Sequence, residues 1–254
     1  MDLSVIPMNK TRHVIVYSLI PLFSSIATSF AVLYLVNQKI IINTPANAWS
    51  SFAYATIDAP FCLKYPLFVL SVSSFNLWSS APVYIDIIDV TSIFWVNINV
   101  TIYVLPGSKH KYKVIYAING IVTLLLLYTI FNRYELYLFD YYGANMIPDV
   151  GIVYVYSGLI LSAFHATDKS YLAGLLCIVS GFNCKLLDLY VQQDWGTCVF
   201  HILTALGTNL VIRVNRFDLL QDERKREREQ HPDSVLEPAF NSMHIQSDNN
   251  NEML

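Results

Sequence analysis

Long apolar segments with few charged side chains dominate this sequence and limit the folds that it can adopt. The first, from Val14 to Val36, contains no charged residue, and at about 1.5 Å per residue such a helix spans a hydrocarbon core of about 30 Å. Only helices and closed barrels satisfy their backbone hydrogen bonds inside a bilayer. We therefore predict an all-α membrane protein with a bundle of seven transmembrane helices, which cover approximately Val14–Val36, Phe61–Trp78, Val83–Leu105, Val114–Phe131, Val150–His165, Tyr171–Tyr190 and Gly196–Ile212.

The residues outside these segments divide the chain into three parts. Hydrophobic residues make up 54% of the sequence and charged residues only 14%, which is too apolar for an ordinary soluble domain. We expect an N-terminus over residues 1–13, a transmembrane domain over 14–216 and a charged, largely disordered tail over 217–254. Within the tail we interpret the charged run 222–229 as a solvated helix extension. Short stretches between the segments, such as Asn43–Asn47, are predicted to be helix-breaking turns.

The distribution of lysine and arginine predicts the orientation of the helices. Eleven of these residues lie on the side that carries the C-terminus and three on the other, with Lys64 and Lys185 inside segments. The positive-inside rule then places the C-terminus in the cytosol and the N-terminus in the lumen or outside the cell, in an endomembrane of the ER or Golgi or in the plasma membrane. Asn9 would then lie in a lumenal glycosylation sequon. The net charge of −3 gives no global basic field for nucleic acid.

Ionisable side chains inside the apolar segments are the candidates for a functional site. Each costs about 2.5–3.5 kcal/mol to insert, so such residues face the bundle interior or a wet cavity. Some of them, such as Lys185 with an aspartate from another helix, can be structural pairs. As a set, Ser74, Asp89, Asp188 and His201 come from different segments and are predicted to converge on one polar site. The full group is Lys64, Asp86, Asp89, Lys185, Asp188 and His201, with Asp58 and His165 near segment ends.

Three stretches of the sequence resemble the alkaline ceramidases, which are seven-helix membrane hydrolases that cleave the amide bond of ceramide. The stretch Phe200–Thr208 looks like their last membrane helix, and Tyr171–Tyr190 is similar to their sixth. Ser74 is followed fifteen positions later by Asp89, which is similar to the spacing of the family's active-site serine and aspartate. The resemblance implies the seven-helix fold of the wider superfamily.

The resemblance also implies a zinc site, and the sequence departs from it. The family's three zinc-binding histidines fall on Trp78, Thr197 and His201, so only His201 is retained. A catalytic zinc needs three protein ligands, whereas indole has no lone pair for a metal and a neutral hydroxyl is a poor ligand. We therefore expect zinc-dependent hydrolysis to be lost or weakened. The residues that would have to rebuild such a site are Cys198, His165, Cys184 and Asp188.

Three functions remain open at this point. The first is a ceramidase-like membrane protein that binds a membrane lipid such as a sphingolipid, or a partner membrane protein, without hydrolysing it. The second is an active lipid amidase with a rearranged metal site, and the third is an unrelated seven-helix transporter or receptor. In the first, the resemblance implies that Ser74 and Asp89 bind the lipid head group with help from His201, and Lys185 and Asp188 belong to the polar core.

Overall fold

The protein is all-helical in the part of the chain that the structure describes. The computed structural model describes residues 18–37, 40–79, 84–105, 110–132, 157–158, 161, 164–165, 168–191 and 195–230. These residues form α2 (Ile20–Asn37), α3 (Pro45–Ser50), the 3-10 helix η2 (Ser51–Thr56), α4 (Phe61–Leu77), α5 (Tyr84–Val104), α6 (Lys111–Asn132), α9 (Lys169–Val191) and α10 (Trp195–Gln230). No strand occurs among them.

Four of these helices are long and apolar enough to cross a membrane. The stretches are Ile87–Val104 in α5, Lys111–Tyr128 in α6, Lys169–Asp188 in α9 and Trp195–Arg213 in α10, and two shorter apolar helical stretches cover Ile20–Val36 and Phe61–Leu77. Their length and composition indicate an integral membrane protein. Most of the segment predicted at 150–165 lies outside the described residues, so the count of seven spans stays a prediction.

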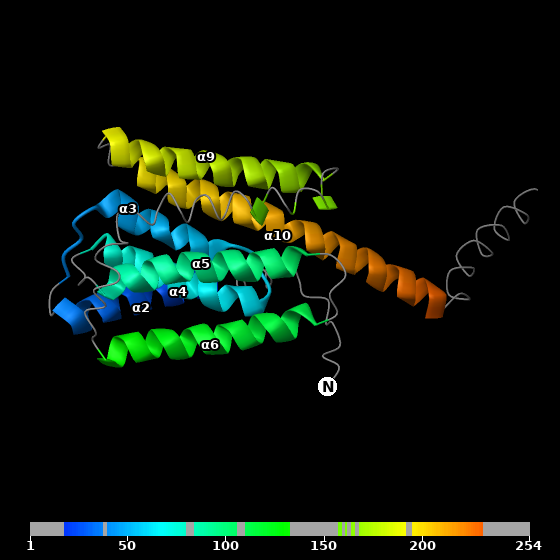
Figure 1. Ribbon diagram of the computed structural model, residues 1–254, viewed down its shortest axis with the longest axis horizontal. Coiled ribbons are helices and arrows are strands. Elements are labelled where there is room, and N and C mark those ends of the chain that lie inside the picture. The colour runs from blue at the N-terminus through cyan, green and yellow to red at the C-terminus, as the bar shows by residue number, and fades with distance from the viewer. Residues whose placement is uncertain are drawn as a thin grey trace, which may run out of the picture. The chain divides into compact units, whose positions relative to one another are not determined.

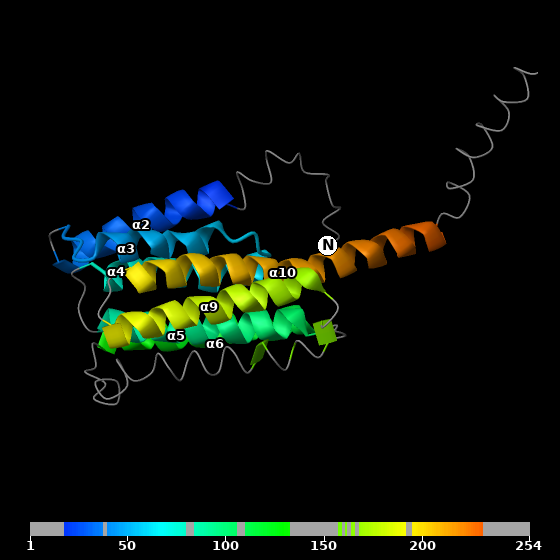
Figure 2. The same cartoon turned by 90° about the horizontal axis from the view of Figure 1, so that it is seen from above.

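The chain divides into two units, Met1–Val214 and Asn215–Leu254. In the first unit the long helices lie side by side with their axes roughly aligned (Figures 1 and 2). Helix α4 contacts α2, α3, η2, α5 and α6, and its side chains Cys62, Leu63, Leu67 and Leu70 belong to the largest apolar cluster. The second unit contains the end of α10, which continues to Gln230. Residues 217–230 of the predicted tail are therefore helical, as the charged run suggested.

The turn predicted at Asn43–Asn47 is only partly a turn, because α3 begins within it at Pro45. A proline is compatible with the first turn of a helix, where its missing N–H has no intrahelical partner in any case. Helix α3 runs directly into η2, and this pair packs against α4. The lysine at position 64 holds the end of η2, because its buried ammonium group donates hydrogen bonds to the Ala55 and Ile57 carbonyls.

Helices α9 and α10 approach each other closely through glycines. A Cβ atom added to Gly174 would lie 2.8 Å from the Gly207 carbonyl oxygen, and one added to Gly207 would lie 2.5 Å from the Gly174 carbonyl oxygen. Small residues at a crossing let two membrane helices pack backbone against backbone. Further along the same pair, the rings of Phe182 and Phe200 meet edge to face with centroids 5.0 Å apart.

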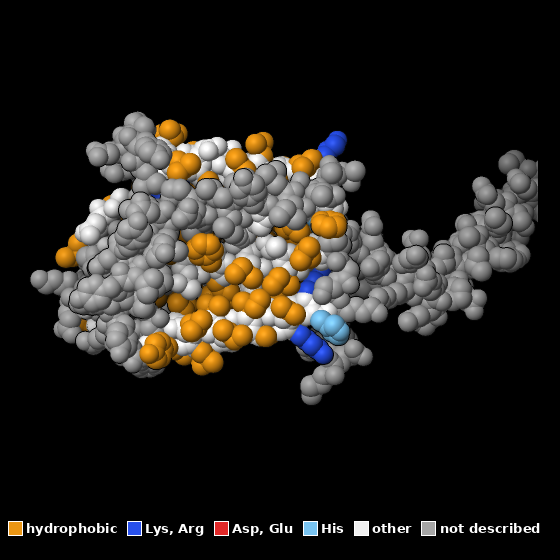
Figure 3. Space-filling view, in the orientation of Figure 1, with side chains coloured by type: hydrophobic (Ala, Val, Ile, Leu, Met, Phe, Trp, Pro, Cys, Tyr) orange, Lys and Arg blue, Asp and Glu red, His pale blue; other side chains and the backbone are white. Residues whose placement is uncertain are grey.

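An apolar surface lies over α6 on one side of the first unit. Figure 3 shows hydrophobic side chains gathered there, with basic side chains and a histidine where α6 begins. Leu124 and Tyr128 are among the exposed large residues, and only 22% of the apolar stretch of α6 is buried. A soluble monomer rarely exposes such a patch, whereas lipid chains cover it in a bilayer.

Candidate functional site

His201 is the centre of a buried polar cluster that joins three parts of the chain. Its side chain on α10 is only 3% exposed. On one side of the ring, Nδ1 lies 2.9 Å from Ser50 Oγ and 3.5 Å from Ser51 Oγ, at the junction of α3 and η2. On the other side, Nε2 lies 3.3 Å from Ser74 Oγ on α4. We call these four residues the His201 site.

In the structure Ser74 contacts His201, whereas Asp89 is hydrogen-bonded to a different serine. Asp89 Oδ1 accepts a hydrogen bond from Ser73 Oγ at 3.2 Å. Neighbouring residues on a helix point about 100° apart, so Ser73 faces α5 while Ser74 faces α10. The sequence spacing therefore identified the two helices that meet, while the serine bonded to Asp89 is Ser73.

Lys185 lies between the two positions at which the resemblance implied zinc ligands. Its ammonium nitrogen donates to Thr197 Oγ1 at 2.7 Å and lies 4.4 Å from the centroid of the Trp78 ring. The residue is 7% exposed, so both contacts are made away from water, where a cation–π interaction is strongest. This fixed cation is close enough to His201 to act on it electrostatically.

Asp188 binds the N-terminus of α10. Its Oδ1 accepts a hydrogen bond from the backbone N–H of Gly196 at 2.7 Å, and its Oδ2 accepts one from the N–H of Thr197. A carboxylate at a helix N-terminus satisfies free N–H groups and complements the helix dipole. A Cβ at position 196 would collide with Asp188 and with the Cys184 carbonyl, so glycine is required there. Asp188 thus positions Thr197 and does not itself bond His201 in the described structure.

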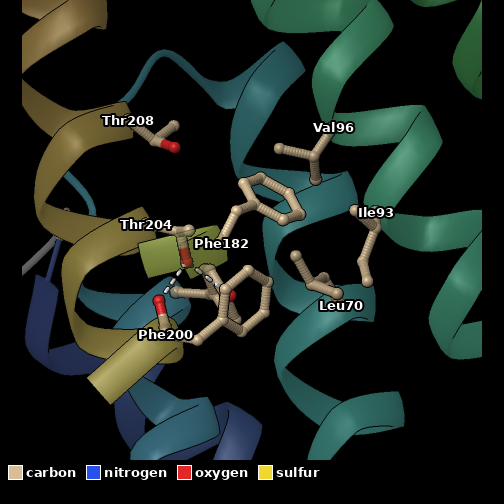
Figure 4. Close-up of a pocket in the computed structure, with 8 residues that line it drawn as sticks. Leu70, Ile93, Val96, Phe182, Phe200, Thr204 and Thr208 are labelled. Atoms are coloured by element: carbon tan, nitrogen blue, oxygen red, sulfur yellow. Dashed lines mark hydrogen bonds between the residues drawn. The ribbon is translucent and has the colours of Figure 1, made fainter. Parts of the chain in front are cut away.

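An apolar slot lies inside the helix bundle (Figure 4). Its cavity volume is only about 20 Å³, within about 300 Å³ of space that is partly open to the surroundings, and it is lined by Tyr54, Leu70, Ile93, Val96, Phe182, Phe200, Thr204 and Thr208. Tyr54 connects the slot to the site, because its ring meets the His201 ring edge-on with centroids 5.7 Å apart. The Tyr54 hydroxyl oxygen lies 2.8 Å from Thr204 Oγ1.

The other ionisable residues predicted inside the membrane have separate partners. His165 Nε2 lies 3.2 Å from the Val104 carbonyl oxygen at the end of α5, away from His201. Lys64 binds the Ala55 and Ile57 carbonyls at the end of η2, as described above. The Asp58 backbone N–H donates to Asn209 Oδ1 at 3.3 Å, and the side chain of Asp86 lies outside the described residues.

The residues that surround His201 do not fit a catalytic zinc ion. Within the described ranges, no three His, Cys, Asp or Glu side chains are grouped closely enough to hold a metal. The nearest groups to the ring nitrogens are neutral hydroxyls, and zinc in proteins prefers imidazole, thiolate and carboxylate. The possible replacements Cys184 and Cys198 are free and partly buried, and His165 contacts Val104 instead.

Four residues of this region were missed by sequence reasoning. Ser50 and Ser51 follow a stretch interpreted as a turn, and Tyr54 and Thr204 carry no charge, so no sequence signal distinguished them. Tertiary packing of the α3–η2 junction against α10 brings the two serines to His201. Comparisons of the chain with protein-family models, with curated proteins and with solved structures find no match.

Proposed function

We propose that this chain is a ceramidase-like membrane protein that binds a long-chain lipid in the apolar slot, with the lipid's polar group at the His201 site, and does not carry out zinc-dependent amide hydrolysis. The motif resemblance supplies the family. The observation that carries the proposal is the position of Lys185 between Trp78 and Thr197, where the resemblance implies zinc ligands.

A lysine in that place opposes a metal ion by its charge. At a separation of about 4 Å and an effective dielectric constant of about 20, an ammonium group and a divalent ion repel each other by about 8 kcal/mol. The single imidazole of His201 cannot offset this repulsion, because catalytic zinc sites have three protein ligands. The ammonium group is itself held by the Thr197 hydroxyl and the Trp78 indole ring.

The slot and the site together suit an amphiphile. A lipid-binding pocket is mostly apolar with a few polar groups that fix orientation, and here Tyr54 and Thr204 join an apolar slot to the hydroxyls around His201. A sphingolipid of the ceramide type carries an amide and hydroxyl groups beside its chains, which are the polar groups that Ser74 and His201 can hydrogen-bond. Asp89, through Ser73, extends the polar surface toward α5.

The proposal includes seven membrane spans, a lumenal or extracellular N-terminus and a cytosolic C-terminus, in the ER, Golgi or plasma membrane. The charge asymmetry supports it, with eleven lysines and arginines on the C-terminal side and three on the other. Glycosylation tags fused to either end test the orientation. We expect modification of the N-terminal tag alone, and modification of the C-terminal tag would contradict the proposed topology.

Photo-crosslinking of purified full-length protein in phosphatidylcholine nanodiscs tests lipid binding. A photoactivatable ceramide analogue should label the protein, and excess unlabelled ceramide should compete. Val96→Trp, which fills the slot, should reduce labelling at least tenfold, whereas Ile121→Trp on the exposed face of α6 should not. Equal labelling of both variants, with both folded by circular dichroism, would refute binding in the slot.

Metal analysis tests the other half of the proposal. The protein purified without chelator should contain much less than one zinc ion per chain. The triple variant Trp78→His, Thr197→His and Lys185→Met should raise the zinc content toward one ion per chain. The double variant Trp78→His and Thr197→His, which retains Lys185, should not. Stoichiometric zinc in the unmodified protein, lost on His201→Ala, would favour the amidase with a rearranged metal site.

A further inference from the structure

The hydrogen bonds around His201 assign the tautomer of its ring. Ser50 Oγ and Ser51 Oγ each donate to the Asn47 carbonyl oxygen at 2.9 Å. A hydroxyl has one hydrogen, so neither serine has a second hydrogen to give to His201. At the 2.9 Å contact with Nδ1, Ser50 Oγ is therefore the acceptor, and Nδ1 carries the ring hydrogen.

This tautomer leaves a lone pair on Nε2, which faces Ser74. In a neutral imidazole one nitrogen is the donor and the other the acceptor. The Ser74 hydroxyl, 3.3 Å from Nε2, must then donate to the ring. A serine that donates to a histidine, whose other nitrogen is held by a third group, is the arrangement of an activated nucleophile. The distance is slightly long, as is common before a substrate binds.

We propose that Ser74 is a nucleophile for metal-independent acyl transfer, with His201 as its general base and Ser50 as a positioning residue, and that its substrate is a long-chain acyl ester. The acyl chain would lie in the apolar slot, which reaches His201 through Tyr54 and Phe200. This inference rests on the proposed function only in assuming that the slot holds a long lipid chain. The serine–histidine pair is a separate observation.

The reaction runs in two balanced steps. In the first step Ser74 Oγ bonds to the carbonyl carbon of the ester, and the hydroxyl proton of Ser74 passes to His201 Nε2. The bond from that carbon to the alcohol oxygen then breaks, and the leaving alkoxide takes the proton from Nε2. The acyl group is then esterified to Ser74. A water molecule gives one proton to Nε2 and its oxygen to the acyl carbon, and Ser74 Oγ leaves and recovers the proton. The ester and water become a carboxylic acid and an alcohol.

The surroundings predict a slow enzyme with a reactive serine. Lys185 lies over Trp78 and acts electrostatically on His201, so its positive charge opposes the imidazolium that forms when His201 takes the proton of Ser74. The group at Nδ1 is a neutral hydroxyl where serine hydrolases have a carboxylate that stabilises the imidazolium. Turnover is therefore a less sensitive test than covalent capture of Ser74.

Labelling with a long-chain alkyl fluorophosphonate, which phosphonylates nucleophilic serines, tests the proposal on full-length protein in nanodiscs. Mass spectrometry should find the adduct on Ser74. His201→Phe should slow labelling at least about 100-fold, in the range of general-base effects. Ser50→Ala should slow it and Ser50→Thr, which keeps the hydroxyl, should restore it. Ser92→Ala should have no effect, because the buried Ser92 hydroxyl bonds only within α5 among the described contacts.

Each other outcome contradicts the proposal. Absence of a Ser74 adduct, or labelling that is equal in the folded His201→Phe variant, would show that the pair is not a nucleophile and base. Labelling abolished by the chelator phenanthroline would show dependence on a metal. If labelling fails while the ceramide analogue still crosslinks in a manner sensitive to Val96→Trp, this inference fails and the proposed lipid binding stands.

Discussion

Replacing Asn119 should destabilise the bundle, because its side chain completes a helix that a proline interrupts. Pro66 lies inside α4 and has no N–H to donate to the carbonyl four residues earlier, that of Cys62. Asn119 on α6 donates to the Cys62 carbonyl oxygen at 2.8 Å instead. Its Oδ1 accepts hydrogen bonds from Trp95 Nε1 at 2.8 Å and from Asn99 Nδ2 at 2.7 Å.

The expected cost of Asn119→Leu follows from these three bonds. The substituted leucine has a similar size but leaves the Cys62 carbonyl, the Trp95 indole and the Asn99 amide without this partner. Side-chain hydrogen bonds in membrane proteins contribute on average about 0.6 kcal/mol and at most about 1.7 kcal/mol each. We therefore expect the free energy of unfolding to fall by about 2–5 kcal/mol.

A double-mutant cycle with Pro66→Ala isolates the bond to Cys62. Alanine at position 66 supplies a backbone N–H to the Cys62 carbonyl, so loss of the Asn119 donor should cost about 0.6–1.7 kcal/mol less in that background. Reversible unfolding in mixed micelles with increasing sodium dodecyl sulfate, followed by circular dichroism, gives the four free energies. A coupling energy below about 0.5 kcal/mol, the usual limit of additivity, would refute the reasoning.

Two further substitutions test the packing. Gly207→Ala should destabilise the protein by about 1–3 kcal/mol, because its Cβ would press against the Gly174 carbonyl, whereas Gly120→Ala, with no atom near its Cβ, should be neutral or stabilise by up to about 1 kcal/mol. If both changes shift the unfolding transition equally, the close approach of α9 and α10 is wrong. Lys64→Met should cost about 1–3 kcal/mol, because the Ala55 and Ile57 carbonyls lose their donor, and Lys64→Arg should recover part of it. Unchanged stability of Lys64→Met in the same assay would contradict that role.

The amino-acid sequence alone predicted the helices and their apolar character, because both depend on local composition and segment length. The six long helices of the described residues lie where apolar segments were expected, whereas α3 and η2 were not predicted; α2 and α4 have shorter apolar stretches than the four candidate spans. The sequence also directed attention to Ser74 and His201, which are in contact. These predictions needed no knowledge of how the helices cross.

Packing alone decided which side chains meet. The rotation and depth of each helix determine three contacts that spacing alone did not predict. Asp89 bonds to Ser73, Lys185 contacts Thr197 and Trp78, and Ser50 contacts His201. One residue along a helix turns a side chain by about 100°, so spacing identifies neighbouring helices more readily than partner atoms. The physical reason is that close contacts, such as that between the glycines of α9 and α10, set those rotations, and they join residues far apart in the chain.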